Sequence, residues 1–219
     1  MEPTFWHERW QTGVTPFHEG VLNRMLGRWF ASLELKAGEQ VFVPLCGKAY
    51  DMRWLLEHGQ RVLGVELSTI ATGDFFKENN IPLTRHSGDL FETFQGSNVQ
   101  ILCGDLFDVS AADLANVRSV YDRASLVALP PPDRQRYAKH LCQYLPPGTS
   151  MLLVSFEYDA TCMNGPPFSV DEAEVRSLYE DRFTIRHLET AEVIEQYPRF
   201  QERGLNSILE HALLCTEHR

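Results

Sequence analysis

From residue 40 onward, short strand-like runs alternate with helical segments, and this alternation constrains the fold more than any other feature. Seven β-branched or apolar runs predict strands, at residues 41–44, 61–66, 99–103, 117–122, 149–156, 183–188 and 207–216. Four segments between them have helical periodicity, at residues 50–58, 68–78, 134–145 and 171–180. Strand–helix alternation needs crossover connections, which produce a largely parallel sheet covered on both faces. We therefore expect an α/β fold with a doubly wound, mostly parallel sheet of seven strands.

Two segments depart from this regular alternation. The last two predicted strands are joined by ETAEVIEQYPRFQERG, which has only a weak helical signal and favours an antiparallel strand at the edge of the sheet. The segment LFETFQGSNVQIL predicts a hairpin before the third strand, with residues 96–98 as its turn.

The N-terminal segment precedes the alternating pattern. Apolar residues at helical spacing predict a helix over residues 19–33 that packs on the sheet. The aromatic stretch FWHERWQTGVTPFH, which Gly13 and Pro16 interrupt, predicts a lid. We expect one domain over residues 1–219, with residues 1–35 as the N-terminal helical lid and residues 36–219 as the α/β core.

Composition excludes several classes of function. The net charge of −10, without a dense cluster of Lys or Arg, argues against nucleic acid as a partner. No apolar run approaches the roughly 18 residues of a membrane span, and the N-terminus lacks the pattern of a signal peptide. The 5 cysteines contain no CxxC pair and no histidine at metal-ligand spacing, so we expect reduced thiols and no metal. A monomeric cytoplasmic protein is the expectation.

The turn after the first strand, PLCGK, lies where an open parallel sheet binds its ligand. The second strand ends at Glu66, nineteen residues after Gly47, a spacing like that of the acidic residue that holds a ribose in such folds. One carboxylate can accept hydrogen bonds from both ribose hydroxyls. The alternative is that Glu66 only caps the helix that begins near Ser68.

The single glycine of this turn indicates which nucleotide it suits. Loops that bind phosphates are glycine-rich because the backbone must approach the phosphate closely. A nucleoside without phosphates, such as S-adenosylmethionine, needs fewer glycines in the turn, because no phosphate has to approach the backbone. The third strand supports this interpretation, because Asp105 follows it and can meet adenine or a ribose, while the amide of Leu106 can read an adenine edge.

The fourth strand ends in Asp122 and Arg123, again on the expected ligand side. Charged groups at this edge of a sheet are often functional. A structural ion pair between the two side chains is the alternative.

Several motifs together resemble one family, the thiopurine S-methyltransferases, and its bacterial members in particular. They are WxxRWxxGxTxFH from Trp6 to His18, VPLCGKAYDM, GVELS, YDRASLVALPP and LPPG. The resemblance covers essentially the whole chain. It implies a class I, Rossmann-like methyltransferase fold that transfers the methyl group of S-adenosylmethionine to the sulfur of aromatic and heterocyclic thiols such as 6-mercaptopurine. Bacterial relatives are also associated with selenium and tellurium methylation, so the expected acceptors include chalcogen compounds and a role in detoxification.

The resemblance also implies site residues. Cofactor contacts would be Trp10, Leu45, Glu66, Asp105, Leu106 and Arg123. Acceptor contacts would be Phe17, His18, Arg123, Pro167 and Arg199. The catalytic roles are hypotheses from the chemistry of methyl transfer: Arg123 would stabilise the thiolate or a ring nitrogen, and Asp122 would orient Arg123 or accept a proton.

Trp10 has a physical role in this scheme, because an aromatic face beside a sulfonium is favourable. A core tryptophan that fixes the N-terminal segment is its alternative. For the whole protein, the competing hypotheses are a nicotinamide-dependent oxidoreductase, which the single-glycine turn disfavours, and an adenosyl-binding module without catalysis.

Overall fold

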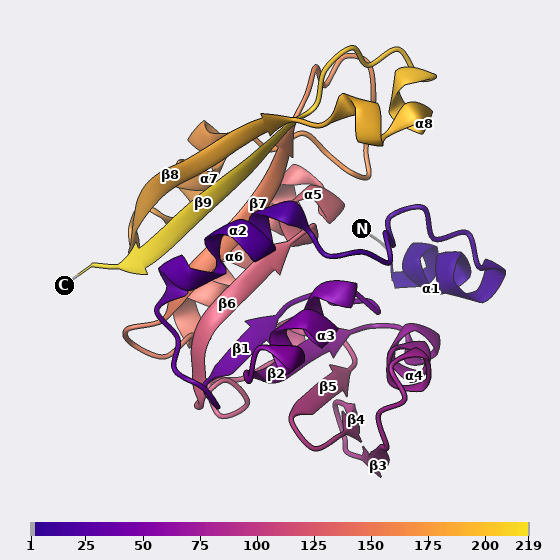
Figure 1. Ribbon diagram of the computed structural model, residues 1–219, viewed down its shortest axis with the longest axis vertical. Helices are drawn as coiled ribbons and strands as arrows, with labels where there is room; N and C mark the ends of the chain where they lie inside the picture. Colours follow the sequence, from indigo (N-terminus) through magenta and orange to yellow (C-terminus); the bar gives the residue numbers. More distant parts are fainter. Residues whose placement is uncertain (1–2, 219) are drawn as a thin grey trace.

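The computed structural model describes residues 3–218, which contain one mixed sheet of 9 strands (Figure 1). The strands are β1 (Gln40–Val43), β2 (Arg61–Glu66), β3 (Thr84–Ser87), β4 (Glu92–Gln95), β5 (Val99–Cys103), β6 (Val117–Arg123), β7 (Ser150–Glu157), β8 (Phe183–Glu192) and β9 (Leu209–Glu217). Their spatial order is β3-β4-β5-β2-β1-β6-β7-β9-β8, and the central run from β5 to β7 is parallel. The predicted doubly wound α/β class is confirmed. Residues 1, 2 and 219 of the predicted domain lie outside the described residues.

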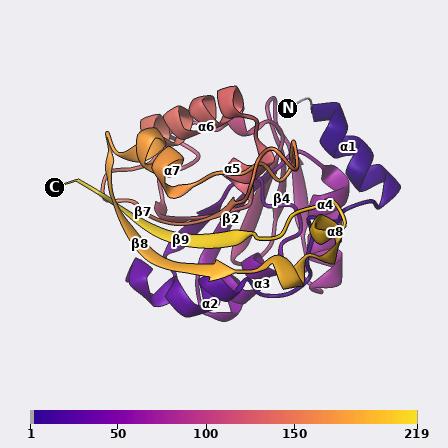
Figure 2. The same ribbon diagram turned by 90° about the horizontal axis from the view of Figure 1, so that it is seen from above.

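Helices cover both faces of the sheet, as Figure 2 shows from above. The α-helices are α1 (Pro3–Thr12), α2 (Arg24–Trp29), α3 (Tyr50–Glu57), α4 (Thr69–Glu78), α5 (Ser125–Ala128), α6 (Pro131–Tyr144), α7 (Glu172–Tyr179) and α8 (Pro198–Gln201). Short 3₁₀ helices are η1 (Phe30–Leu33), η2 (Leu106–Asp108) and η3 (Ile194–Gln196). Apolar side chains of α2, α3 and α4 pack on one face, and those of α5, α6 and α7 pack on the other. Within residues 3–218, no helix combines the length and apolarity needed to cross a membrane.

The central strand β1 shows why the sheet needs two covering layers. All of its residues are buried. Because successive side chains point to opposite faces, Val41 and Val43 join the core under α2 and α3, whereas Phe42 joins the core under α6. The continuous apolar run of β1 therefore reflects burial from both sides.

The sheet has two more strands than the seven predicted, because a β3–β4 hairpin extends its edge. The turn at residues 96–98 is confirmed, with the Gly96 N–H donating to the Val99 carbonyl at 2.8 Å. Strand β3 carries the sequence TRHS and is exposed throughout, so it offers no apolar pattern to detect. At the other edge, β9 is antiparallel as expected but lies between β7 and β8, which makes β8 the edge strand.

The helix predicted over residues 19–33 is wrong at its beginning. Asn23 is the N-cap of α2, and its side-chain oxygen accepts from the Met25 N–H at 2.9 Å and the Leu26 N–H at 3.3 Å. Val21, an apolar residue inside the predicted helix, is 64% exposed. The chain between α1 and Asn23 is therefore irregular.

The order of the parallel strands reverses between β1 and β6. From β1 the chain proceeds to β2 and β5 on one side, and it returns to β6 and β7 on the other. Helices α1 and α8 lie at the end of the sheet where the parallel strands finish (Figures 1 and 2). Open α/β sheets bind ligands at such a reversal, outside the carboxyl ends of the strands.

Candidate active site

A cavity of about 500 Å³ opens at this reversal point. Its walls come from the turn after β1, the ends of β2, β5 and β6, and the N-terminal segment with α1. Eight of the predicted site residues line it: Trp10, Phe17, His18, Leu45, Glu66, Asp105, Leu106 and Arg123. Three predicted residues do not line it: Asp122, Pro167 and Arg199.

The turn after β1 has an unusual backbone that the rest of the fold holds in place. Leu45 and Gly47 have φ angles of 47° and 52°, in the left-handed region that costs a residue with a side chain more than it costs glycine. The Cys46 N–H donates to the Val65 carbonyl at 2.9 Å, and the Ser125 hydroxyl donates to the Pro44 carbonyl at 3.0 Å. The turn is thus tied to the end of β2 and to the start of α5.

Glu66 connects this turn to the start of α4. Its carboxylate accepts from the Gly47 N–H and from the Ser68 N–H, each at 2.8 Å. Burial raises the pKa of Glu66, and the hydrogen bonds from Ser68 and Gly47 oppose that increase. The helix cap itself is Ser68, whose hydroxyl accepts from the Ala71 N–H. Two of the carboxylate's roughly four lone-pair positions are used, so others can accept ribose hydroxyls.

We expect Glu66→Gln to weaken binding of S-adenosylhomocysteine, the expected product of S-adenosylmethionine, by about 1–3 kcal/mol, because an amide oxygen replaces a charged acceptor in a buried site. Isothermal calorimetry measures the loss. Ser68→Ala is the matched control: it removes the cap of α4 and lowers stability by about 1 kcal/mol, but should keep the affinity. Equal affinities for wild type and Glu66→Gln would leave Glu66 with a structural role alone.

Trp10 forms the cavity wall that lies against the β1 turn. It is 7% exposed, and a Cβ added at Gly47 would lie only 3.2 Å from its ring. Phe17 packs edge-on against both Trp6 and Trp10, with ring centroids 5.4 Å apart in each pair. The sequence left two alternatives for Trp10, a cofactor contact and a core residue. The structure is compatible with both, since Trp10 is packed like a core residue and also lines the cavity.

Beyond β5, the chain turns at Asp105 to form the other end of the cavity. The Asp105 carboxylate accepts from the Phe107 N–H at 2.9 Å and so caps η2, while Leu106 is buried. The Arg136 guanidinium lies 3.6 Å from the centroid of the Phe107 ring. Both Phe107 and Arg136 line the cavity, and the sequence analysis did not select either.

Arg123 at the end of β6 meets a partner that the sequence analysis missed. Its guanidinium donates to Glu19, which also accepts from the Tyr197 hydroxyl at 2.6 Å. Burial lowers the pKa of Arg123, but Glu19, Tyr121 and Asp51 raise it, and the net change is upward. Arg123 is therefore charged. Its neighbour His18 has a lowered pKa because of burial and the nearby Lys48, so its ring is neutral at pH 7.

Asp122 does not share the cavity with Arg123. Successive side chains of β6 point to opposite faces, and Asp122 points into the core beneath α6, where it accepts from the Tyr137 hydroxyl at 2.7 Å. It is 1% exposed, and its other oxygen has no hydrogen-bond partner among the described residues. The prediction that Asp122 orients Arg123 is therefore corrected: alternation along the strand separates them.

Burial raises the pKa of Asp122 to about 6, from 3.8, and the hydrogen bond from the Tyr137 hydroxyl opposes that increase. The protonated carboxyl thus stabilises the folded chain fully below about pH 4, and this contribution of about 3 kcal/mol is lost as pH rises through 6. We expect the stability of Asp122→Asn relative to wild type to increase between pH 4 and pH 7, with turnover retained. Thermal melts across that range measure it; a constant difference would contradict the burial argument.

The other two predicted site residues that do not line the cavity, Pro167 and Arg199, belong to the C-terminal part of the chain. The Pro167 carbonyl accepts from the Tyr158 hydroxyl at 2.6 Å, so this residue supports a loop. Arg199, on α8, donates to the Pro16 carbonyl and stacks on Phe200 at 4.6 Å. Arg199 thus fixes the N-terminal segment and does not face the cavity.

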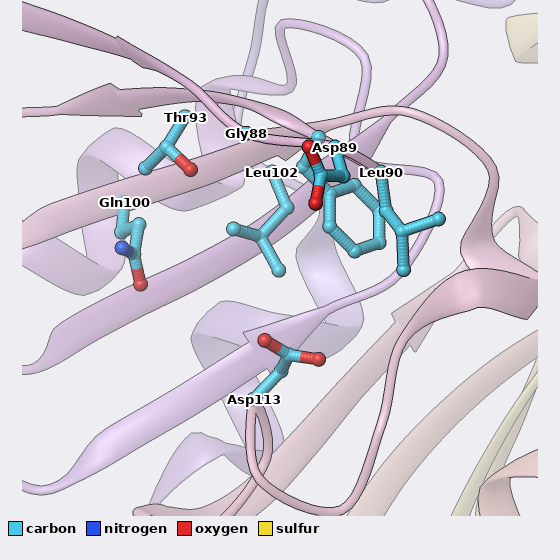
Figure 3. A pocket seen from close by; sticks show the side chains of 8 residues that line it. Gly88, Asp89, Leu90, Thr93, Gln100, Leu102 and Asp113 are labelled. Atoms are coloured by element: carbon cyan, nitrogen blue, oxygen red, sulfur yellow. The ribbon is translucent and has the colours of Figure 1, made fainter.

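A second hollow lies beside the β3–β4 hairpin (Figure 3). It contains none of the predicted site residues, and its Asp113 carboxylate is used by the N–H and hydroxyl of Ser110. Within the described part of the chain, no three His, Cys, Asp or Glu side chains are grouped to hold a metal.

Comparison with solved structures supports the fold. The chain resembles a crystal structure of an S-adenosylmethionine-dependent methyltransferase from Anabaena variabilis, with a TM-score of 0.69 and 13% identity, over 99% of this chain and 95% of that one. It also resembles Burkholderia thailandensis 1,6-didemethyltoxoflavin-N1-methyltransferase, solved with 1,6-didemethyltoxoflavin and S-adenosylhomocysteine (TM-score 0.68, 15% identity, 99% and 87% covered). At these identities the likeness shows the class I methyltransferase fold.

Sequence comparison is more specific. The family model for thiopurine S-methyltransferase matches residues 1–218. Thiopurine S-methyltransferase of Nitrosospira multiformis is 45% identical over 214 residues, which cover 98% of this chain and 97% of the relative. That of Pseudomonas entomophila is 44% identical over 218 residues, which cover 99% and 100%. This chain belongs to the thiopurine S-methyltransferase family, and it is a methyltransferase that depends on S-adenosylmethionine.

Proposed function

We propose that the cavity binds S-adenosylmethionine beside an aromatic or heterocyclic thiol, such as a thiopurine, and that the enzyme methylates the thiol sulfur. Selenium and tellurium compounds are further proposed acceptors, in detoxification. We propose a monomeric enzyme that needs no metal and acts in the cytoplasm, where its 5 cysteines stay reduced. The negative net charge disfavours nucleic acid as a partner.

The residues present fit the adenosyl cofactor. Carboxylates of Glu66 and Asp105 stand at neighbouring strand ends, where ribose hydroxyls need acceptors. Leu106 and Phe107 provide an apolar surface for adenine, and Trp10 provides an aromatic wall near the β1 turn, suited to the sulfonium. Bound there, the cofactor supplies an activated methyl group.

The protein's own contribution is positioning and charge. Methyl transfer to sulfur needs alignment and exclusion of water more than a strong base. Trp6, Trp10 and Phe17 form an interlocked aromatic wall over the cavity, which suits a flat acceptor ring. Arg123 lies on the same cavity and is charged, so its guanidinium can stabilise a thiolate.

The observation that carries this proposal is that Arg123 and the aromatic wall line one cavity with Glu66. The test is a panel of 6-mercaptopurine, thiophenol, selenide and tellurite with labelled S-adenosylmethionine, with and without EDTA. Methylated sulfur is expected, and EDTA should change nothing. S-adenosylhomocysteine should stabilise the fold by about 2.7 kcal/mol at 100 times its dissociation constant. Stabilisation by NADH instead, or loss of turnover in EDTA, would overturn the proposal.

A further inference from the structure

Glu19 lines the cavity beside Arg123, and the function proposed above gives its carboxylate no role in the reaction. Arg123 donates to one of its oxygens and the Tyr197 hydroxyl to the other. The Glu19 side chain is still 25% exposed, compared with 11% for Arg123. Because a carboxylate offers about four lone-pair positions, each Glu19 oxygen can accept another hydrogen bond.

The two side chains together match one form of the acceptor. When a ring nitrogen neighbours the carbon that bears sulfur, a heterocyclic thiol takes the thione form, with C=S as a hydrogen-bond acceptor and the adjacent N–H as a donor. Arg123 is a donor and Glu19 is an acceptor, and they are hydrogen-bonded neighbours on the cavity wall. A thione can therefore pair its sulfur with Arg123 and its N–H with Glu19, while an aryl thiol without ring nitrogen has no group for Glu19.

We propose that Glu19 accepts the ring N–H proton of a neutral thione during methyl transfer and thereby favours thiones over thiols that lack a ring N–H. This inference rests on the proposed S-methyltransferase function. As the sulfur gains the methyl group, its C=S bond becomes single and the nitrogen lone pair forms a C=N bond. The N–H pair remains on nitrogen as its proton moves to a Glu19 oxygen. The electron pair of the broken methyl bond stays on the departing sulfur, which becomes a neutral thioether, so charge balances.

Several ionisable groups interact electrostatically with this carboxylate. They are Arg123 of β6, Asp51 of α3, Glu210 of β9, Arg199 of α8, and His18 and Tyr197 in the flanking segments. Burial is the largest cause of a raised pKa for Asp51 and Glu210 and of a lowered pKa for His18, whose ordinary value is 6.5. Because the pKa of His18 is lowered, loss of its proton precedes measurements made at neutral pH and above.

The first test is an equilibrium measurement on the complex with S-adenosylhomocysteine. Ultraviolet absorption follows the ionisation of bound 6-mercaptopurine as pH rises. We expect Glu19→Gln to lower the pKa of bound 6-mercaptopurine relative to the wild-type complex, and to weaken binding of its neutral form about 10-fold, the loss of one charge-assisted hydrogen bond. Glu19→Ala gives the same comparison if the glutamine variant does not fold. An unchanged ligand pKa in the variant overturns the proposal.

Turnover with two acceptors supplies the second test. Glu19→Gln should lower kcat/KM for 6-mercaptopurine by about 100-fold, and the loss should shrink as pH rises. The same variant should match or exceed wild type with thiophenol, which has no ring N–H. Arg199→Ala is the matched control, because Arg199 holds the same segment through Pro16 and should lower both activities equally. If Glu19→Gln lowers kcat/KM equally for 6-mercaptopurine and thiophenol, Glu19 has only a structural role and the proposal is overturned. If the wild-type enzyme methylates neither acceptor, the proposed function itself is refuted.

Discussion

Arg123→Lys is expected to lower turnover of thiols about 100-fold although it keeps the positive charge. The guanidinium has five donors in a planar fork, so it can hold Glu19 and an acceptor sulfur together, which one flexible ammonium cannot do in the same geometry. Arg123 is charged and largely buried. Little solvent reaches the site, so water cannot replace the contacts that the lysine ammonium fails to make. Steady-state kinetics with two thiols of different acidity measures the loss.

The pH dependence separates two roles for Arg123. If its guanidinium stabilises the thiolate, the loss in Arg123→Lys should be greatest for the less acidic thiol and should shrink as pH rises. If it serves the cofactor, the Michaelis constant for S-adenosylmethionine should rise by the same factor with every acceptor. Asp122→Asn is a neighbouring control, because Asp122 points into the core beneath α6. Full activity of Arg123→Lys would remove Arg123 from the reaction.

The sequence was most informative where periodicity and position carried the signal. Strand–helix alternation predicted the parallel core. Glu66 and Asp105 were predicted to lie together because they stand at the carboxyl ends of two strands, and both line the cavity. Strand β3 was missed because an exposed edge strand needs no apolar residue. The start of α2 was misplaced because Asn23, a capping residue, outweighs the apolar spacing before it.

The site partners depended on contacts between distant parts of the chain. Glu19 reaches Arg123 and Tyr197, residues 104 and 178 positions away, and no local pattern encodes such pairs. The sequence signal that could have identified Glu19 as a site residue was its position directly after Phe17 and His18, which were predicted to contact the acceptor. Asp122 was assigned to the site because it precedes Arg123, although the alternation of side chains along a strand already implied that the two face apart.

Removal of residues 1–18 is expected to leave a folded domain whose turnover falls about 1000-fold, as the sequence-based prediction of an N-terminal lid implies. The deletion takes away Trp10 and Phe17, which form one wall of the cavity, and so admits water to the reacting sulfur. The sheet and both of its main cores are built from later residues, and circular dichroism should confirm that they persist. Trp10→Phe is the matched control, since it keeps an aromatic wall and should retain most activity. Full turnover by the truncated chain would show that the aromatic segment only packs against the domain.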